Sequence, residues 1–135
     1  KCRISDVSLK DHQTLFIEIQ ADKEFSVRDY QELKDAAKEL GNGKKMYNLI
    51  NVGEHTIPCK EAREMSSSID GSKFKMADAF VIKSLSQKIV ANMMLKVNKP
   101  TVPTRFFDKI EDAEKWLFDL RIDHFFHEVS TQEEA

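Results

Sequence analysis

The sequence has few cysteines and no long apolar run, and both absences exclude classes of protein. Its 135 residues include only two cysteines, Cys2 and Cys59. Two cysteines cannot build a disulfide framework, and their separation matches no metal-binding motif. No apolar stretch approaches the roughly 18 residues that a membrane-spanning helix requires. We therefore expect a reduced, cytoplasmic protein without a membrane span.

The chain also lacks a large excess of charge of either sign. Its 21 Lys and Arg residues nearly balance 23 Asp and Glu residues, which gives a formal net charge of −2. A nucleic-acid-binding domain needs a basic patch or stripe, so nucleic acid is not an expected partner. The chain begins at Lys1 rather than at a methionine, which leaves open whether an N-terminal segment with a targeting signal precedes it.

The order of the apolar patterns predicts strands that alternate with helices, which is typical of a parallel sheet with crossover helices. We expect an α/β fold with a four-stranded, mostly parallel core sheet, to which the first runs could add an N-terminal edge strand. Residues 1–121 would form a single domain, and residues 122–135 a C-terminal extension that is partly helical or frayed. The expected strands are residues 4–9, 14–19, 46–52, 79–82 and 103–107, and the expected helices are residues 26–40, 57–69, 85–98 and 110–120.

Polar residues mark the starts of these helices. Ser26 with Asp29, and Ser84 with Gln87, have the spacing of capping boxes, in which each side chain bonds the backbone of the other residue. Thr56 precedes a proline by two residues, and proline fits the first turn of a helix. We therefore expect Thr56 to be the N-cap of the second helix.

Two helices carry apolar residues at helical spacing. Those of the third helix include Met93 and Met94, which we expect in the core; a pocket for an apolar ligand is the alternative. The last helix should bury Trp116 because this side chain shares a face with other apolar residues. The third-helix set is Leu85, Ile89, Val90, Met93, Met94 and Val97, and the last-helix set is Ile110, Ala113, Trp116, Leu117 and Leu120.

Three segments carry a family resemblance: residues 77–92 (ADAFVIKSLSQKIVAN), 97–107 (VNKPTVPTRFF) and 111–117 (EDAEKWL). With the strand at 47–52, the chain resembles the SpoIIAA-like branch of the STAS/SEC14 domain superfamily over residues 14–121. This branch has the fold of bacterial anti-sigma-factor antagonists, and many of its members have no assigned activity. The resemblance implies a βα superhelix and a non-enzymatic role as a regulatory or protein-interaction module. A small polar or anionic ligand is the alternative.

One turn departs from the pattern of the antagonist proteins. Those proteins carry a phosphorylatable serine in an Asp-Ser-Ser-Gly-like motif at a helix start. The matching turn of this chain, residues 53–59, reads GEHTIPC and has Thr56 as its only hydroxyl residue. Thr56 is therefore the candidate phosphoacceptor, and its rival role is that of a helix cap.

A ligand of an open parallel sheet binds outside the carboxyl ends of the strands, where loops enter helices. Asn51, Thr56, Lys83 and Ser84 fall at these ends. Helix N-termini offer unpaired N–H groups and partial positive charge, so a small anion or metabolite could bind beside Ser84. The competing interpretation is that Ser84 is only an N-cap and that Lys83 is solvated.

The other reactive side chains form no convincing catalytic or metal-binding set. Cys59 lies near a helix start, where a thiol pKa can fall, but it lacks a fixed basic partner. His124 and His127 have helical ligand spacing without a third ligand. The Gly-Asn-Gly-Lys sequence at residues 41–44 ends a helix, whereas a phosphate loop begins one. We therefore expect no enzyme activity, cofactor or metal; a protein partner and a homodimer both remain open.

Overall fold

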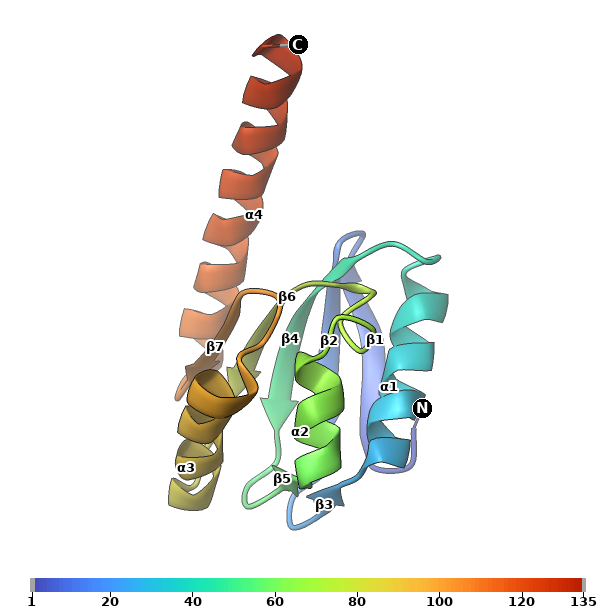
Figure 1. Ribbon diagram of the computed structural model, residues 1–135, viewed down its shortest axis with the longest axis vertical. Coiled ribbons are helices and arrows are strands. Elements are labelled where there is room, and N and C mark those ends of the chain that lie inside the picture. Colours follow the sequence, from blue (N-terminus) through green and yellow to red (C-terminus); the bar gives the residue numbers. More distant parts are fainter. Residues whose placement is uncertain (1, 135) are drawn as a thin grey trace.

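The computed structural model describes residues 2–134 of the chain, and side chains of residues 2–130. Within these residues, five strands form one sheet in the order β1-β2-β4-β6-β7 (Figure 1). β1 runs antiparallel to β2 and is the N-terminal edge strand, and the remaining pairs are parallel. The predicted α/β fold with its mostly parallel sheet is therefore confirmed. The strands are β1 (Ser5–Asp11), β2 (Thr14–Ile19), β4 (Met46–Val52), β6 (Lys75–Val81) and β7 (Thr104–Phe107).

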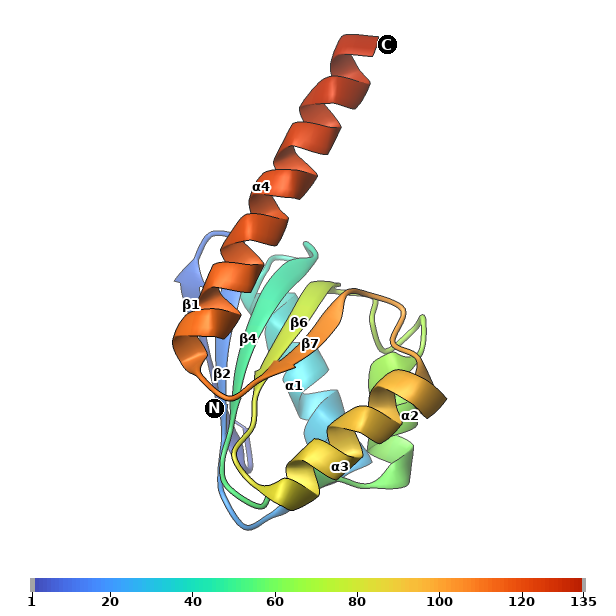
Figure 2. The same cartoon turned by 90° about the vertical axis from the view of Figure 1, so that its left-hand side faces the viewer.

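The helices lie on both faces of this sheet (Figure 2). Three helices that connect successive parallel strands cover one face, and α4 lies on the other. A short parallel pair, β3 with β5, lies at the lower end of the domain (Figure 1). The helices are α1 (Val27–Leu40), α2 (Lys60–Ser67), α3 (Leu85–Met93), which continues into a π-helical turn η1 (Met94–Asn98), and α4 (Ile110–Glu134); the short strands are β3 (Glu24–Phe25) and β5 (Ile57–Pro58).

Alternation along the strands divides the core into two layers, because successive side chains of a strand point to opposite faces. In β4, Met46 and Ile50 pack beneath α1, α2 and α3, whereas Tyr47 and Leu49 pack beneath α4. Asn48 shares the face of Met46 and Ile50, so an amide lies in the middle of an apolar layer. No helix of the described residues is long and apolar enough to cross a membrane.

The two predicted capping boxes are present. The Ser26 hydroxyl accepts from the Asp29 N–H, and the Asp29 carboxylate accepts from the Ser26 N–H. Ser84 and Gln87 make the equivalent reciprocal pair at the start of α3. Reciprocal capping satisfies two N–H groups that a helix start otherwise leaves without partners.

The predicted start of the second helix is wrong. Ile57 and Pro58 form β5 rather than a helical turn, and α2 begins at Lys60 with Cys59 as its N-cap. Thr56 is therefore not a helix cap. The fixed φ of proline is compatible with an extended strand as well as with a helix start, and pairing with β3 decides between them.

Two predicted helix faces also need correction. On α3 the buried positions are Gln87 and Ala91, followed by Met94, whereas Leu85 and Ile89 are exposed. On α4 Ala113 and Leu117 are buried as expected, but Trp116 is only partly buried. Its ring lies 5.8 Å from that of Phe107, under the Arg105 guanidinium.

The C-terminal half of α4 extends beyond the sheet (Figure 2). The helix runs without a break through residue 122 to Glu134. The ring of His124, on α4, contacts the ring of Tyr47 on β4. The next two residues of α4, Phe125 and Phe126, are 60% and 61% exposed.

Candidate functional site

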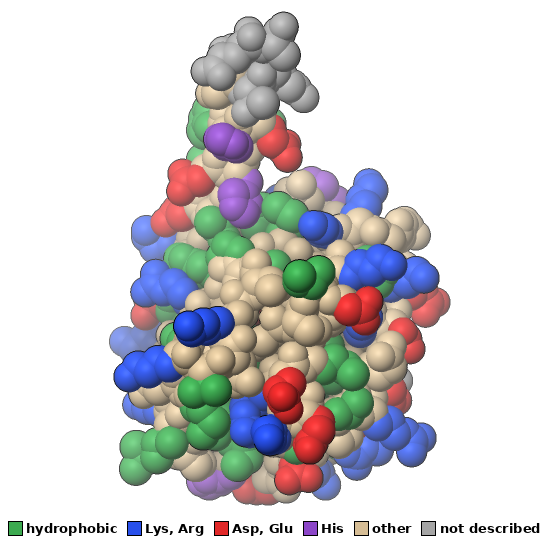
Figure 3. Space-filling view, in the orientation of Figure 1, with side chains coloured by type: hydrophobic (Ala, Val, Ile, Leu, Met, Phe, Trp, Pro, Cys, Tyr) green, Lys and Arg blue, Asp and Glu red, His purple; other side chains and the backbone are tan. Residues whose placement is uncertain are grey.

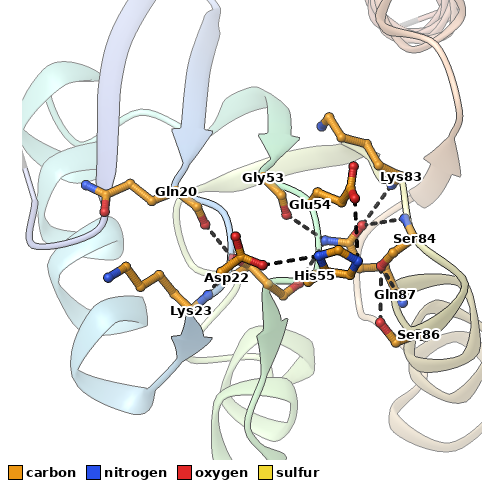
Figure 4. A network of polar contacts seen from close by, with 11 residues as sticks. Gln20, Asp22, Lys23, Gly53, Glu54, His55, Lys83, Ser84, Ser86 and Gln87 are labelled. Atoms are coloured by element: carbon orange, nitrogen blue, oxygen red, sulfur yellow. Dashed lines mark hydrogen bonds and ion pairs between the residues drawn. The ribbon is translucent and has the colours of Figure 1, made fainter.

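Lys83 and Ser84 follow the carboxyl end of β6 and lie beside the turn after β4 (Figure 4). Asn51 belongs to the end of β4, and Thr56 belongs to that turn. The Lys83 ammonium donates to Asn51 Oδ1 at 2.8 Å and to the Val52 carbonyl oxygen. Burial lowers the pKa of Lys83, and the nearby Glu54 carboxylate opposes that shift. The Ser84 hydroxyl accepts the capping bond from the Gln87 N–H. An anion at this edge would compete with these internal bonds for Lys83 and Ser84.

Gln87 connects the start of α3 to the turn after β4. The sequence predicted only a capping role for this residue. Its Oε1 accepts from the N–H groups of Lys83 (2.8 Å) and Ser84 (3.0 Å). Its Nε2 donates to the carbonyl oxygens of Gly53 (2.8 Å) and Thr56 (2.9 Å). Gln87 is 3% exposed, so these four bonds join the start of α3 to the turn after β4 in the interior of the protein.

Thr56 is 2% exposed and is held by the loop after β2. Its hydroxyl donates to the Gln20 carbonyl oxygen and accepts from the Lys23 N–H at 3.1 Å. Gly53, in the same turn, approaches the backbone so closely that a Cβ would lie 2.3 Å from the Ala21 nitrogen. The candidate phosphoacceptor is thus a buried bridge between two loops.

The remaining reactive side chains are engaged in local contacts. The Cys59 sulfur accepts from the Ala62 N–H at 3.4 Å, as an N-cap does. The His124 Nδ1 hydrogen bonds to the Tyr47 hydroxyl, and His55, with φ of 69°, lies 3.1 Å from an Asp22 carboxylate oxygen. Among the described residues, no group of three or more His, Cys, Asp or Glu side chains is arranged to hold a metal ion.

A cavity of about 110 Å³ lies between the sheet and helices α1, α2 and α3. Its walls are mostly apolar, with side chains from strands β2, β4 and β6 on one side and from the helices on the other. The predicted methionine set is split, because Met94 lines this cavity whereas Met93 is 39% exposed. The main apolar walls are Ile17, Leu33, Ile50, Ala62, Phe80, Ile82, Ala91 and Met94.

A buried polar cluster forms one part of the cavity wall. The Lys75 ammonium lies 2.7 Å from Asp78 Oδ2, and Asn48 Nδ2 donates to Asp78 Oδ1 at 2.8 Å. Lys75 also donates to the Ser66 carbonyl and hydroxyl oxygens at 3.0 and 3.2 Å. Burial opposes the charge of Lys75, but Asp78 and Tyr30 outweigh burial and raise its pKa. Lys75 and Asp78 therefore form a buried ion pair.

The outer face of α3 is apolar and exposed. Leu85, Ile89 and Met93 are spaced four residues apart on one helix face, with exposures of 74%, 58% and 39%. Hydrophobic side chains gather over α3 at the lower left of the space-filling view (Figure 3). The helix and its π-helical turn carry Lys88 and Lys96 and no acidic residue.

The sequence contains a signal for the buried cluster that was not used. Asn48 and Asp78 are polar residues in the middle of two apolar strands, and they lie opposite each other in the parallel pairing of β4 with β6. Polar residues within a doubly covered strand need internal partners, so their pairing could have been predicted. Lys75 lay outside the predicted strand, which began four residues too late.

The comparisons with known proteins establish the fold and the family. A solved structure of an uncharacterised DUF3478-family protein with a SpoIIAA-like fold, from Shewanella loihica PV-4, superposes with a TM-score of 0.59 at 14% identity. The match covers 84% of this chain and 93% of that chain, so the predicted SpoIIAA-like fold is confirmed. No curated protein matches the sequence. The family model of a domain of unknown function, DUF7793, matches residues 7–121, and the chain therefore belongs to the DUF7793 family.

Proposed function

We propose that this protein is a non-enzymatic interaction module whose α3 face binds an acidic, amphipathic segment of a protein partner. The observation that carries the proposal is the exposed stripe of Leu85, Ile89 and Met93. Apolar residues repeated along one exposed helix face form a typical docking surface for an apolar helix face of a partner. Any regulatory role of the module would act through this binding.

The charges beside the stripe support the choice of an acidic partner. Lys88 and Lys96 are exposed on the same helix, which has no acidic residue of its own. The Lys88 ammonium is 3.6 Å from the Asp108 carboxylate, an exposed contact that a partner carboxylate can replace. A segment with aliphatic side chains and flanking Asp or Glu matches both the apolar and the basic parts of this surface.

The hydrogen bonds within the carboxyl edge of the sheet also support a binding role for the α3 face rather than catalysis at the edge. Gln87 uses all four of its amide hydrogen-bonding positions on backbone groups, and Ser84 caps α3. Side chains held in this way fix the position of α3 relative to the sheet. A fixed helix presents its outer face at a low entropic cost of binding.

The test uses helical peptides selected by display against the whole protein. Selected peptides should carry apolar residues three and four positions apart together with Asp or Glu, and their affinity should fall as salt rises. Ile89→Ser should weaken binding at least about tenfold, as expected for a residue central to an interface. Ile69→Ser is the matched control, because Ile69 is 83% exposed outside α3 and its loss should leave affinity unchanged.

Four results would contradict the proposal. Peptides without acidic residues would contradict the charge argument, and equal effects of Ile89→Ser and Ile69→Ser would remove α3 from the interface. Sedimentation with phosphatidylglycerol vesicles that is lost in Ile89→Ser would assign the face to a membrane surface instead. A dimer that Ile89→Ser dissociates, measured by analytical ultracentrifugation, would assign the face to a second copy of this chain.

A further inference from the structure

The cavity between the sheet and α1–α3 contains one buried acceptor without a partner. Asn48 lines this cavity, is 5% exposed and donates through Nδ2 to Asp78. Its Oδ1 is buried and has no hydrogen-bond partner among the described residues. A buried carbonyl oxygen without a donor is destabilising, so this atom is a binding position for a donor group.

The other polar groups of the cluster are already paired. Both oxygens of Asp78 accept bonds, one from Asn48 and one from Lys75. The Tyr30 hydroxyl donates to the Gly71 carbonyl oxygen at 2.8 Å. The charges of Lys75 and Asp78 balance each other, so neither side chain is available as a counter-ion for a charged ligand. Two side-chain atoms of the lining residues are left without a partner among the described residues: Asn48 Oδ1, which accepts, and Arg63 Nε, which donates.

We propose that this cavity binds a small, uncharged, mostly apolar molecule that carries one hydroxyl or N–H group and donates it to Asn48 Oδ1. The volume of about 110 Å³ sets the size of the ligand. A designed apolar cavity of about 150 Å³ accepts benzene, so a ring-sized molecule is near the upper limit here. The apolar walls favour the body of such a molecule, and Asn48 fixes its orientation.

Water is the competing occupant. A buried water requires two to four polar partners, as a rule about three. The unpartnered side-chain atoms of the lining residues are Asn48 Oδ1 and Arg63 Nε among the described residues, and the walls are otherwise mostly apolar. A molecule with one donor and an apolar body matches this distribution better than water, which would leave most of its own bonds unmade.

Phenol is the probe for this proposal, with benzene and benzoate as matched controls on the wild-type protein. Phenol at millimolar concentration should shift the amide NMR signals of the lining residues in a saturable manner. Benzene lacks the donor and should bind about fivefold to tenfold more weakly, the effect of one hydrogen bond. Benzoate has no proton to donate to Asn48 Oδ1 and should bind more weakly than phenol; tighter binding of benzoate would assign the cavity to an anion held by Arg63 and overturn the proposal. Equal affinities for phenol and benzene would remove Asn48 from the site.

Two neighbouring alanines of α1 provide variants. Ala37 lines the cavity and Ala36 does not, so Ala37→Leu should abolish phenol binding while Ala36→Leu retains it. A folded Asn48→Leu variant should bind phenol and benzene equally. If this variant does not fold, the comparison of phenol with benzene on the wild-type protein tests the role of Asn48. Absence of saturable phenol binding, with water signals inside the cavity, would overturn the proposal. Shifts confined to the outer face of α3 would overturn it as well.

Discussion

Asn48 lies opposite Asp78 in the parallel pairing of β4 with β6 and donates a hydrogen bond of 2.8 Å to its carboxylate. The other oxygen of that carboxylate is 2.7 Å from the Lys75 ammonium. A salt bridge of two nearly inaccessible side chains thus lies in the layer beneath α1 and α2. Removing one partner of such a pair costs much more than replacing both, because a single removal leaves a buried charge.

We predict that Lys75→Met lowers the free energy of unfolding by about 3–5 kcal/mol, because Asp78 is then a buried, unpaired carboxylate. Asp78→Asn should cost a similar amount through the unpaired Lys75. The double variant should be no less stable than either single variant. Urea unfolding measures all three, and simple additivity would contradict the coupling. Lys115 with Asp119, an exposed pair on α4, is the control, and its removal should change stability little.

The bonds of Gln87 yield a second prediction. Gln87→Ala removes an amide that satisfies two N–H groups and two carbonyl oxygens, so it should lower the free energy of unfolding by about 2–3 kcal/mol. Amide exchange should accelerate in the turn around Gly53 and Thr56 as well as at the start of α3. Asn92→Ala, at an exposed position of the same helix, is the control and should leave both measurements unchanged.

The sequence predicted the meeting of Asn51, Thr56, Lys83 and Ser84, because parallel strands bring their carboxyl ends to one edge of the sheet. It did not predict that Gln87 bonds to residues 34 and 31 positions away, because a capping-box residue is recognised from local spacing alone. The order of strands and helices can be predicted from hydrophobic periodicity. Hydrogen bonds between side chains and distant backbone groups depend on how these elements are arranged in space.

Periodicity also failed to distinguish the two faces of α3. Both sides of α3 carry apolar residues, Leu85 and Ile89 on one side and Val90 and Met94 on the other. Hydrophobicity alone therefore does not identify the inner face. The small residue Ala91 and the bonds of Gln87 turn the second side toward the sheet. An apolar stripe that is left outside is then a feature of the surface rather than of the core.

Thr56 should carry no stoichiometric phosphate in protein purified from its own host, because its hydroxyl is buried and donates to the Gln20 carbonyl. Intact-protein and peptide mass spectrometry measure this directly, and full phosphorylation of Thr56 would contradict it. Thr56→Val should lower the free energy of unfolding by about 1–3 kcal/mol, since the Lys23 N–H loses its acceptor. Thr101→Val, at an exposed site, should change stability little.

The carboxylate of Asp29 anchors the N-terminal segment to α1. Asp29 is 1% exposed and accepts bonds from the Arg3 guanidinium at 2.9 and 2.7 Å as well as from Ser26. Burial alone would raise the pKa of Asp29, but the bonds from Arg3 and Ser26 outweigh burial and lower it. The ionised form is therefore favoured by folding, and protonation opposes folding.

The sign of the resulting pH dependence follows from that lowered pKa. The contribution of Asp29 is fully present above the pKa of an unfolded aspartate, about 3.9, and is lost as the pH falls through the lower folded value. Asp29→Asn should lower the free energy of unfolding at neutral pH by about 1–2 kcal/mol, an estimate reduced for the solvent screening of Arg3. Below about pH 4 the variant should lose less stability than the wild type, so the two curves should converge. Asp35→Asn, at an exposed position of the same helix, is the control and should follow the wild-type curve of stability against pH. Parallel curves for Asp29→Asn and the wild type would contradict the prediction, because they would show that the Asp29 carboxylate has the same pKa in the folded and unfolded states.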